Sequence, residues 1–260
     1  MESNSVEKAV ELLAGARSNH QRLEGLPVGC RPVTIEDSYQ IQDSLIKRLG
    51  LQVGGWKVGA TSPKAQQMLG TDEPFSGRMF KSGILGTKEV VSMATLFAPG
   101  VEVEVAFCLG HDLPAGPTYS RDQVADAVST LHPAIEVVDT RYTGGLKAGI
   151  FQIVADNGAH AAFIVGEGIV DWHDIDRKAA AAKLVISGET ISTGVGANAL
   201  GDPLDSLVWL VNDRSRQGDG LFSGDLITTG SCCEELGWAK AGDHVVAEFD
   251  TLGSVEVVFT

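Results

Sequence analysis

Apolar residues recur every three or four positions in two stretches near the start of the chain. Over residues 4–18 this spacing predicts an amphipathic helix. The same spacing predicts a second helix over 35–49, with Thr34 as a candidate N-terminal cap and Gly50 as its stop. We therefore expect a helical N-terminal unit over residues 1–52.

From residue 53 onward the pattern changes to short runs of β-branched residues separated by glycine, which is typical of strands. The predicted strands are 56–58, 84–91, 101–109, 134–138, 161–165, 183–187 and 225–229, followed by a hairpin of 244–249 and 254–259. Helical spacing recurs only over 121–131 and 204–217. Since strands dominate and do not alternate regularly with helices, the pattern predicts an α+β fold with a β-rich domain over 53–260.

The chain has 260 residues and a formal net charge of −14, with no cluster of lysine and arginine. This balance argues against nucleic acid or an anionic membrane surface as a partner, because both are bound chiefly by basic patches. No apolar run is long enough to cross a bilayer and the first residues lack the pattern of a signal peptide, so we expect a cytoplasmic protein. The four cysteines lack metal-binding spacing, and most of them are expected to be buried thiols.

Two glutamates stand two positions apart in the valine-rich run 101–105. In a strand, Glu102 and Glu104 would point to the same face, roughly 6.6 Å apart. Either this face is exposed to water, or a cation or a proton lies between the carboxylates. Glu136 is a third acid, inside the apolar stretch 133–138, and the three carboxylates would form a set of oxygen ligands suited to Mg²⁺ or Mn²⁺.

Two further segments place polar groups among apolar or small residues. Lys57 lies between Trp56 and Val58, where burial would lower its pKa and suit it to proton transfer, whereas a strand edge would leave it in solvent. The segment 228–231, Thr-Thr-Gly-Ser, would offer N–H groups and hydroxyls to a carboxylate, or would simply turn at its glycine. The motifs of zinc proteases, serine hydrolases, P-loop proteins and dinucleotide-binding folds are absent.

Several short motifs follow one another in order along most of the chain. They are Thr34–Gln42, Trp56–Ser62, Leu69–Pro74, Val101–Phe107, Pro133–Arg141, Val154–Asn157, Gly201–Leu204, Val208–Leu210 and Leu252–Val255. In this order and separation they resemble the fumarylacetoacetate hydrolase superfamily. Within it, they are similar to the branch of 2-keto-4-pentenoate hydratases and 4-oxalocrotonate decarboxylases.

The resemblance implies a mixed β-roll or barrel with a divalent cation, Mg²⁺ or Mn²⁺, at its mouth, and a homo-oligomeric protein. Residues that match the family's functional positions are expected to share one site. They are Glu102, Glu104 and Glu136 for the metal and Lys57, Asp72 and Asp156 for catalysis, with Lys57 also binding substrate. Thr229 and Gly230, from the segment 228–231 described above, are further candidates for substrate binding. Among these, Lys57 matches the lysine of the family's K-[VIM]-G-x-T motif, which contacts substrate or transfers a proton.

Some positions depart from the family pattern. Gly100 stands where members usually have arginine or lysine before the paired acids, and Ser76 replaces an aromatic or acidic residue. Asp202 occupies the histidine position of a Gly-His-Pro-Leu motif, and Gly158-Ala-His160 follows Asn157 where members often have Ala-Ser. These changes keep the expected metal ligands and put the usual substrate in doubt.

The reaction implied by the resemblance is metal-dependent hydration of a 2-hydroxy-2,4-dienoate to a 4-hydroxy-2-oxo acid, in the catabolism of aromatic ring-cleavage products. The segment Lys57-Val-Gly59 is closer to the hydratase form than to the decarboxylase form. Decarboxylation of a 2-oxohexenedioate and C–C hydrolysis of an acylpyruvate are the alternatives, the latter with His20 and Glu24 as a loose match to lid residues. Outside enzymes, the alternative is a partner subunit of a hydratase–decarboxylase complex.

Overall fold

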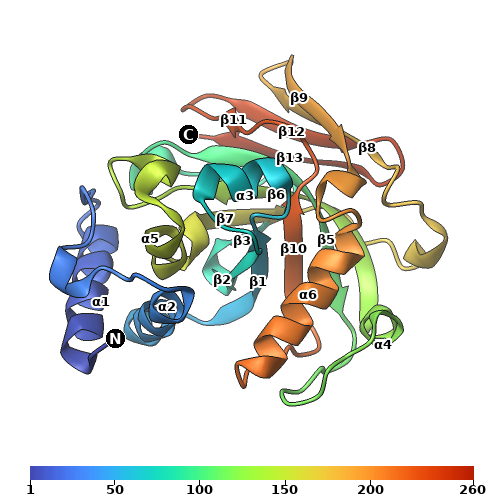
Figure 1. Ribbon diagram of the computed structural model, residues 1–260. Coiled ribbons are helices and arrows are strands. Elements are labelled where there is room, and N and C mark those ends of the chain that lie inside the picture. The colour runs from blue at the N-terminus through green and yellow to red at the C-terminus, as the bar shows by residue number, and fades with distance from the viewer.

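The computed structural model describes residues 1–260 as two β-sheets, with helices gathered beside the larger sheet and in front of it (Figure 1). The α-helices are α1 (Ser3–Ser18), α2 (Ile35–Leu49), α3 (Pro63–Leu69), α4 (Arg121–Asp126), α5 (Ile150–Ala155) and α6 (Pro203–Arg216). Short 3-10 helices are η1 (Val28–Cys30), η2 (Lys81–Gly83), η3 (Met93–Thr95), η4 (Gly145–Ala148), η5 (Asn157–Ala159), η6 (Trp172–Asp174) and η7 (Gly196–Asn198). No helix combines the length and apolar character needed to cross a membrane.

The larger sheet has eight strands, in the order β2-β1-β10-β5-β6-β7-β3, with β11 paired to β5. Their bounds are β1 (Val53–Gly59), β2 (Phe75–Phe80), β3 (Ile84–Gly86), β5 (Gly100–Leu109), β6 (Val128–Val138), β7 (His160–Val165), β10 (Leu226–Ser231) and β11 (Gly237–Trp238). The pairs β1–β10 and β3–β7 are parallel and the other pairs are antiparallel, so the sheet is mixed.

The smaller sheet has five strands in the order β4-β13-β12-β8-β9. These are β4 (Val90–Val91), β8 (Ala181–Ile186), β9 (Glu189–Val195), β12 (His244–Phe249) and β13 (Gly253–Phe259). The predicted C-terminal hairpin is confirmed as β12 and β13. A core of 38 buried residues joins the two sheets, and it includes Val101, Val103 and Val105 of β5. Because side chains alternate along a strand, the acids of β5 point away from this core.

The larger sheet curls around a second, smaller group of buried side chains. Met79 of β2 and Phe163 of β7 meet Ala106 of β5 and Ala134 of β6 in this group, although β2 and β7 are not paired. The small alanine side chains let the sheet bend, and the larger Met79 and Phe163 fill the concave side. The structure therefore has the predicted α+β roll, but no closed barrel, since β2 and β3 remain the ends of the sheet.

The predicted N-terminal helices are α1 and α2, which lie beside α5 (Figure 1). Thr34 caps α2 by accepting from the Asp37 N–H at 3.1 Å, and Gly50 ends it with a φ of 62°. Their apolar faces share a core of 18 buried residues with Phe75 and the residues of α5. Residues on both sides of position 52 thus pack together, and the division into 1–52 and 53–260 stays a prediction.

Two sequence predictions of secondary structure are wrong. The segment 121–131 is helical only to Asp126 and then continues as β6, because Val128–Leu131 pair with the end of β5. The segment 84–91 is not one strand, since β3 belongs to the larger sheet and β4 to the smaller one. The sequence patterns also missed α3, α5, β2, β9 and β11.

Candidate functional site

The register of β5 and β6 gathers the three predicted acids. Glu102 stands directly opposite Glu136, and Glu104 follows two residues later on the same face of β5. Each acid offers one carboxylate oxygen that lies within 4.8 Å of those of the other two. Glu104 and Glu136 are fully buried and Glu102 is half-buried.

Each buried acid has one oxygen held by the protein and one oxygen without a partner. Glu104 Oε2 accepts from the Gly230 N–H at 2.7 Å and from the Thr228 hydroxyl, while Glu104 Oε1 has no hydrogen-bond partner. Glu136 Oε1 lies 3.1 Å from Lys57 Nζ and 2.9 Å from His160 Nδ1, while Glu136 Oε2 has no hydrogen-bond partner. Buried carboxylate oxygens without donors are unfavourable unless a cation binds them, and these two acids together with Glu102 suit a hard divalent ion. The donor set therefore fits a metal such as Mg²⁺.

Lys57 lies within the same cluster, on β1. Its Nζ is 3.1 Å from Glu136 Oε1 and donates to the carbonyl of Gly158, in η5, at 3.1 Å. The side chain is buried, as one of the two sequence interpretations required. Burial acts to lower the pKa of Lys57, but the charges of Glu136, Glu102 and Glu104 outweigh it and raise the pKa. The predicted lowering of this pKa is therefore wrong, and the ammonium form is favoured.

His160 supports Glu136 from the start of β7. Its Nδ1 is 2.9 Å from Glu136 Oε1, and burial lowers the pKa of the imidazole. A neutral ring facing a carboxylate must carry its proton on Nδ1, because the carboxylate can only accept. His160 therefore orients Glu136 through a donated hydrogen bond.

The protonation of the three acids is unequal. Burial, followed by the charge of Glu136, raises the pKa of Glu102 to about 7 and that of Glu104 well above its usual range. Burial acts in the same direction on Glu136, but Lys57 and His160 outweigh it and its pKa is lowered. Without a metal, the cluster thus retains protons near neutral pH, and a cation must displace them in order to bind.

This proton retention predicts a pH-dependent effect of Mg²⁺ on stability. Between the ordinary carboxyl pKa of 4.5 and the folded value of about 7, the metal-free folded protein binds more protons at Glu102 than the unfolded chain does. Its stability therefore falls as pH rises through that window. We expect Mg²⁺ to raise the melting temperature more at about pH 8 than at about pH 5.5, measured against EDTA by calorimetry. An equal rise at both pH values would contradict this.

The segment 228–231 contributes to the site through β10. Its pairing with β5 shifts register between Thr228 and Ser231, which frees the Gly230 N–H to donate to Glu104. Gly230 has a φ of 98°, and a Cβ there would lie 1.9 Å from Thr61 Oγ1, so only glycine fits. The Thr229 hydroxyl donates to the Val105 carbonyl at 2.7 Å and is therefore occupied within the sheet.

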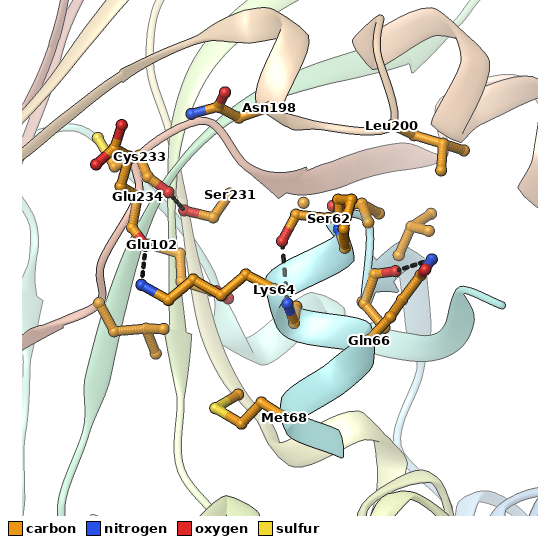
Figure 2. A pocket seen from close by; sticks show the side chains of 18 of the residues that line it. Ser62, Lys64, Gln66, Met68, Glu102, Asn198, Leu200, Ser231, Cys233 and Glu234 are labelled. Atoms are coloured by element: carbon orange, nitrogen blue, oxygen red, sulfur yellow. Dashed lines mark hydrogen bonds between the residues drawn. The ribbon is translucent and has the colours of Figure 1, made fainter. Parts of the chain in front are cut away.

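A cavity of about 710 Å³ opens beside Glu102 and Gly230 (Figure 2). One wall is α3 with the loop that precedes it, and the others are η7 with the residues after it and the segment 230–236. Figure 2 shows Lys64 reaching from α3 toward the segment that carries Glu234, whose carbonyl accepts from Lys64 Nζ at 3.2 Å. Of the acid cluster, Glu102 lines this chamber, whereas Glu104, Glu136 and Lys57 are buried beside it and do not line it.

The structure does not bring Asp72 or Asp156 into the lining of this chamber. Asp72 is exposed in the turn after α3. Asp156 is fully buried at the end of α5, where it pairs with Arg141 Nε at 2.8 Å and Arg17 Nη2 at 2.9 Å. Nearby Asp139 does not pair with Arg141 and instead accepts from the backbone N–H groups of Phe97 and Ala98.

The environment of Asp156 predicts a structural effect of its replacement. Asp156→Asn removes the charge that compensates buried Arg141 and is expected to cost about 3–5 kcal/mol in the free energy of unfolding. Urea denaturation measures this loss, with Asp72→Asn as the exposed control, for which a change within about 0.5 kcal/mol is expected. An unchanged stability with turnover reduced about 100-fold would instead assign Asp156 a role in proton transfer.

Some residues of the site had no distinctive signal in the sequence. His160 lacks metal-binding spacing, and its contact with Glu136 depends on the pairing of β6 with β7. Lys64 reaches the chamber only because α3 follows β1 directly, and α3 was not predicted. Ser62 and Pro63 form a recognisable cap and first turn for α3, so the segment does carry a helix-start signal.

Comparison of the sequence with known proteins identifies the family of this chain. The family model described as Fumarylacetoacetate (FAA) hydrolase C-terminal matches residues 64–260. A 2-keto-4-pentenoate hydratase of Burkholderia vietnamiensis is 39% identical over 221 residues, covering 85% of this chain and 83% of that protein. A 4-oxalocrotonate decarboxylase of Pseudomonas putida is 30% identical over 230 residues, covering 87% and 86%.

A solved structure agrees over the whole chain. It is 4-oxalocrotonate decarboxylase from Pseudomonas putida G7 complexed with magnesium and adipate, which superposes with a TM-score of 0.91 at 25% identity and covers 100% of this chain and 99% of that one. A second structure of that enzyme is complexed with calcium and acetate. Fold, acid cluster and sequence agree, and the chain belongs to the fumarylacetoacetate hydrolase family.

Proposed function

We propose that this protein is a metal-dependent hydratase that converts a 2-hydroxy-2,4-dienoate to a 4-hydroxy-2-oxo acid. The observation that carries the proposal is the acid cluster itself: two buried carboxylate oxygens without partners, beside a buried lysine and an open chamber. The relatives named 2-keto-4-pentenoate hydratase support the reaction type. The cation would be Mg²⁺ or Mn²⁺, held by Glu102, Glu104 and Glu136.

Bound between the three acids, a divalent cation would act as a Lewis acid toward the C1 carboxylate and C2 oxygen of the substrate. The chain's own residues then have separate tasks. Lys57, held in its ammonium form, donates a proton to the terminal carbon of the diene while the enol hydroxyl loses its proton to solvent. The product of this step is an α,β-unsaturated 2-oxo acid, to which water adds at C4, with its proton passing to C3.

The residues around the acids keep this arrangement fixed. His160 orients Glu136 through its donated hydrogen bond, and the Gly230 N–H and Thr228 hydroxyl orient Glu104. Groups that hold a metal ligand in place contribute roughly 10–100-fold to affinity or activity. We assign Asp156 a structural role as the buried partner of Arg141, and the Thr229 hydroxyl a role in the strand pairing.

The decarboxylase alternative shares the acids and the lysine, so a product assay decides between the two. Purified protein with Mg²⁺ is incubated separately with 2-hydroxypenta-2,4-dienoate and with 2-oxohex-3-enedioate, with products followed by NMR and carbon dioxide trapped. We expect a 4-hydroxy-2-oxo acid from the first substrate, and no product after EDTA treatment. Stoichiometric carbon dioxide from the second, with no hydroxylated product from the first, would overturn the hydratase proposal.

The remaining alternatives give other outcomes in the same assay. Acylpyruvate cleavage would need the loosely matched His20, which stacks on Phe97 with ring centroids 4.3 Å apart and does not line the chamber. A partner subunit without activity would turn over neither substrate and would not bind Mg²⁺ in a calorimetric titration. Homo-oligomeric assembly and association with a second enzyme stay predictions from the resemblance.

A further inference from the structure

The chamber beyond the acid cluster is larger than a five-carbon acid requires. Its volume of about 710 Å³ lies within the roughly 300–1,000 Å³ that pockets for drug-sized ligands occupy. Glu102 and Gly230 mark one side of it, where the carboxylate and C2 oxygen of the proposed substrate would bind. The remaining space is therefore available to the other end of the substrate, its tail.

The walls around this space present apolar side chains at several points. They come from three separate parts of the chain and are Val58, Ala60, Pro63, Met68, Leu200 and Leu236. Met68 is 54% exposed although it lies on the wall, so an apolar ligand there would bury surface that water now covers. These walls favour an uncharged substituent.

The charges in the tail region are unfavourable for a second carboxylate. Lys64 is the one basic residue of the lining, and its Nζ is paired with Glu235 Oε1 and the Glu234 carbonyl. Glu234 and Glu235 also line the chamber, so acids outnumber bases there even without Glu102. A terminal carboxylate would enter a space lined by two acidic residues and no free cation, and like charges brought together reduce affinity.

We propose that this chamber selects 2-hydroxydienoic acids with a single carboxylate and an extended, uncharged tail, and that Glu235 enforces this choice by engaging Lys64. The inference rests on the proposed function, because it takes the acid cluster as the anchor for the C1 end. It goes further by naming the class of tail and the ion pair that discriminates. The exposed Glu235–Lys64 ion pair contributes little to the stability of the fold. Its effect is to neutralise Lys64, the one basic side chain that lines the chamber.

Three substrates with the same reacting end test the selection. They are 2-hydroxypenta-2,4-dienoate, its homologue with a butyl group on the terminal carbon, and 2-hydroxynona-2,4-dienedioate, which carries a second carboxylate at the end of a tail of the same length. With Mg²⁺ present, we expect kcat/KM to rise from the first to the second, and to be at least about tenfold lower for the third than for the second. Equal or higher kcat/KM for the dicarboxylate would overturn the proposal.

Variants of the ion pair test its role. Glu235→Gln frees Lys64 and is expected to raise kcat/KM for the dicarboxylate about tenfold relative to the butyl substrate. Adding Lys64→Met to Glu235→Gln is expected to cancel that gain. Glu248→Gln breaks the comparably exposed pair with Lys183 on the smaller sheet and serves as the matched control, with no change in preference expected. A selective loss of dicarboxylate activity on Lys64→Met alone would show that Lys64 already binds the tail carboxylate, which contradicts the proposal.

A binding measurement separates this proposal from the proposed reaction. Calorimetric titration of the Mg²⁺-loaded protein compares 2-oxoheptanoate with 2-oxoadipate, neither of which can be hydrated. Tighter binding of 2-oxoheptanoate, reversed toward 2-oxoadipate in Glu235→Gln, supports the selection even if none of the dienoates is turned over. Equal affinities for the two 2-oxo acids would overturn the selection even if hydration is observed.

Discussion

Replacing Glu104 by glutamine is expected to abolish Mg²⁺-dependent turnover while the protein stays folded. Glu104 Oε1 is a buried oxygen without a partner, and the amide of glutamine cannot supply the negative charge that a divalent cation needs. Since loss of a group that merely orients a ligand costs roughly 10–100-fold, loss of the ligand itself is expected to exceed about 100-fold. Steady-state kinetics and calorimetric titration with Mg²⁺ measure the two losses.

The thermal stability of Glu104→Gln gives a second test, because the melting temperature is not expected to fall together with turnover. In the absence of metal, burial and then the charges of Glu136 and Glu102 oppose ionisation of Glu104, so Glu104→Gln is expected to melt at the same temperature as the unchanged protein or higher in EDTA. It is also expected to lose the rise that Mg²⁺ produces. Glu248→Gln, at a half-exposed position of β12, is the control and retains both turnover and the Mg²⁺ effect. Full turnover in Glu104→Gln would support the alternative interpretation, in which the acids of β5 do not bind a catalytic metal.

Replacing Lys57 by methionine is expected to separate catalysis from metal binding. Methionine fills the buried space without the ammonium group, and loss of a proton donor reduces kcat by about 10²–10⁴-fold. Mg²⁺ affinity is expected to rise, because the ammonium group, 3.1 Å from Oε1 of Glu136, repels a cation bound at the other oxygen of that carboxylate. Kinetics and Mg²⁺ titration of the same preparation test both directions.

The control for this prediction is Lys183→Met, which removes a lysine at a half-exposed position of β8. Proton exchange gives an independent readout, since the unchanged protein is expected to incorporate deuterium from solvent at the terminal carbon of the product and Lys57→Met is not. If Lys57→Met lost Mg²⁺ binding in parallel with turnover, the lysine would hold the acids in place and would not transfer the proton.

The local part of the site could be predicted from the sequence, because it depends on alternation along one strand. Val101, Val103 and Val105 predicted a face of β5 toward a core, and the structure buries them there and places Glu102 and Glu104 opposite. Glu136 lay within a predicted strand, but its position across from Glu102 depends on the register between β5 and β6. A one-residue slip would have turned it to the other face, so the sequence pattern alone was insufficient.

The errors have a common physical origin in long-range contacts. The pKa of Lys57 rises because three acids from two other strands surround it, which no local pattern contains. Asp156 is neutralised by Arg17, 139 positions earlier in the chain. The helix predicted over 121–131 ends early because sheet pairing overrides its local propensity. The family resemblance, which rests on the order of short motifs along the chain, was confirmed where predictions from single patterns failed. That order reflects the whole fold and not one local segment.

The N-terminal helices α1 and α2 contact the segment between Val154 and His160 but do not line the chamber. Gln42 of α2 donates to the carbonyls of Ser76 and Val154, at 3.1 and 2.8 Å, and Arg17 of α1 holds Asp156. The chain between Val154 and His160 carries the carbonyl of Gly158 that accepts from Lys57. The region in which mutations can tune the rate is therefore wider than the lining of the chamber. In a randomly mutated library selected for faster turnover, substitutions in α1 and α2 should be enriched alongside those at the chamber itself.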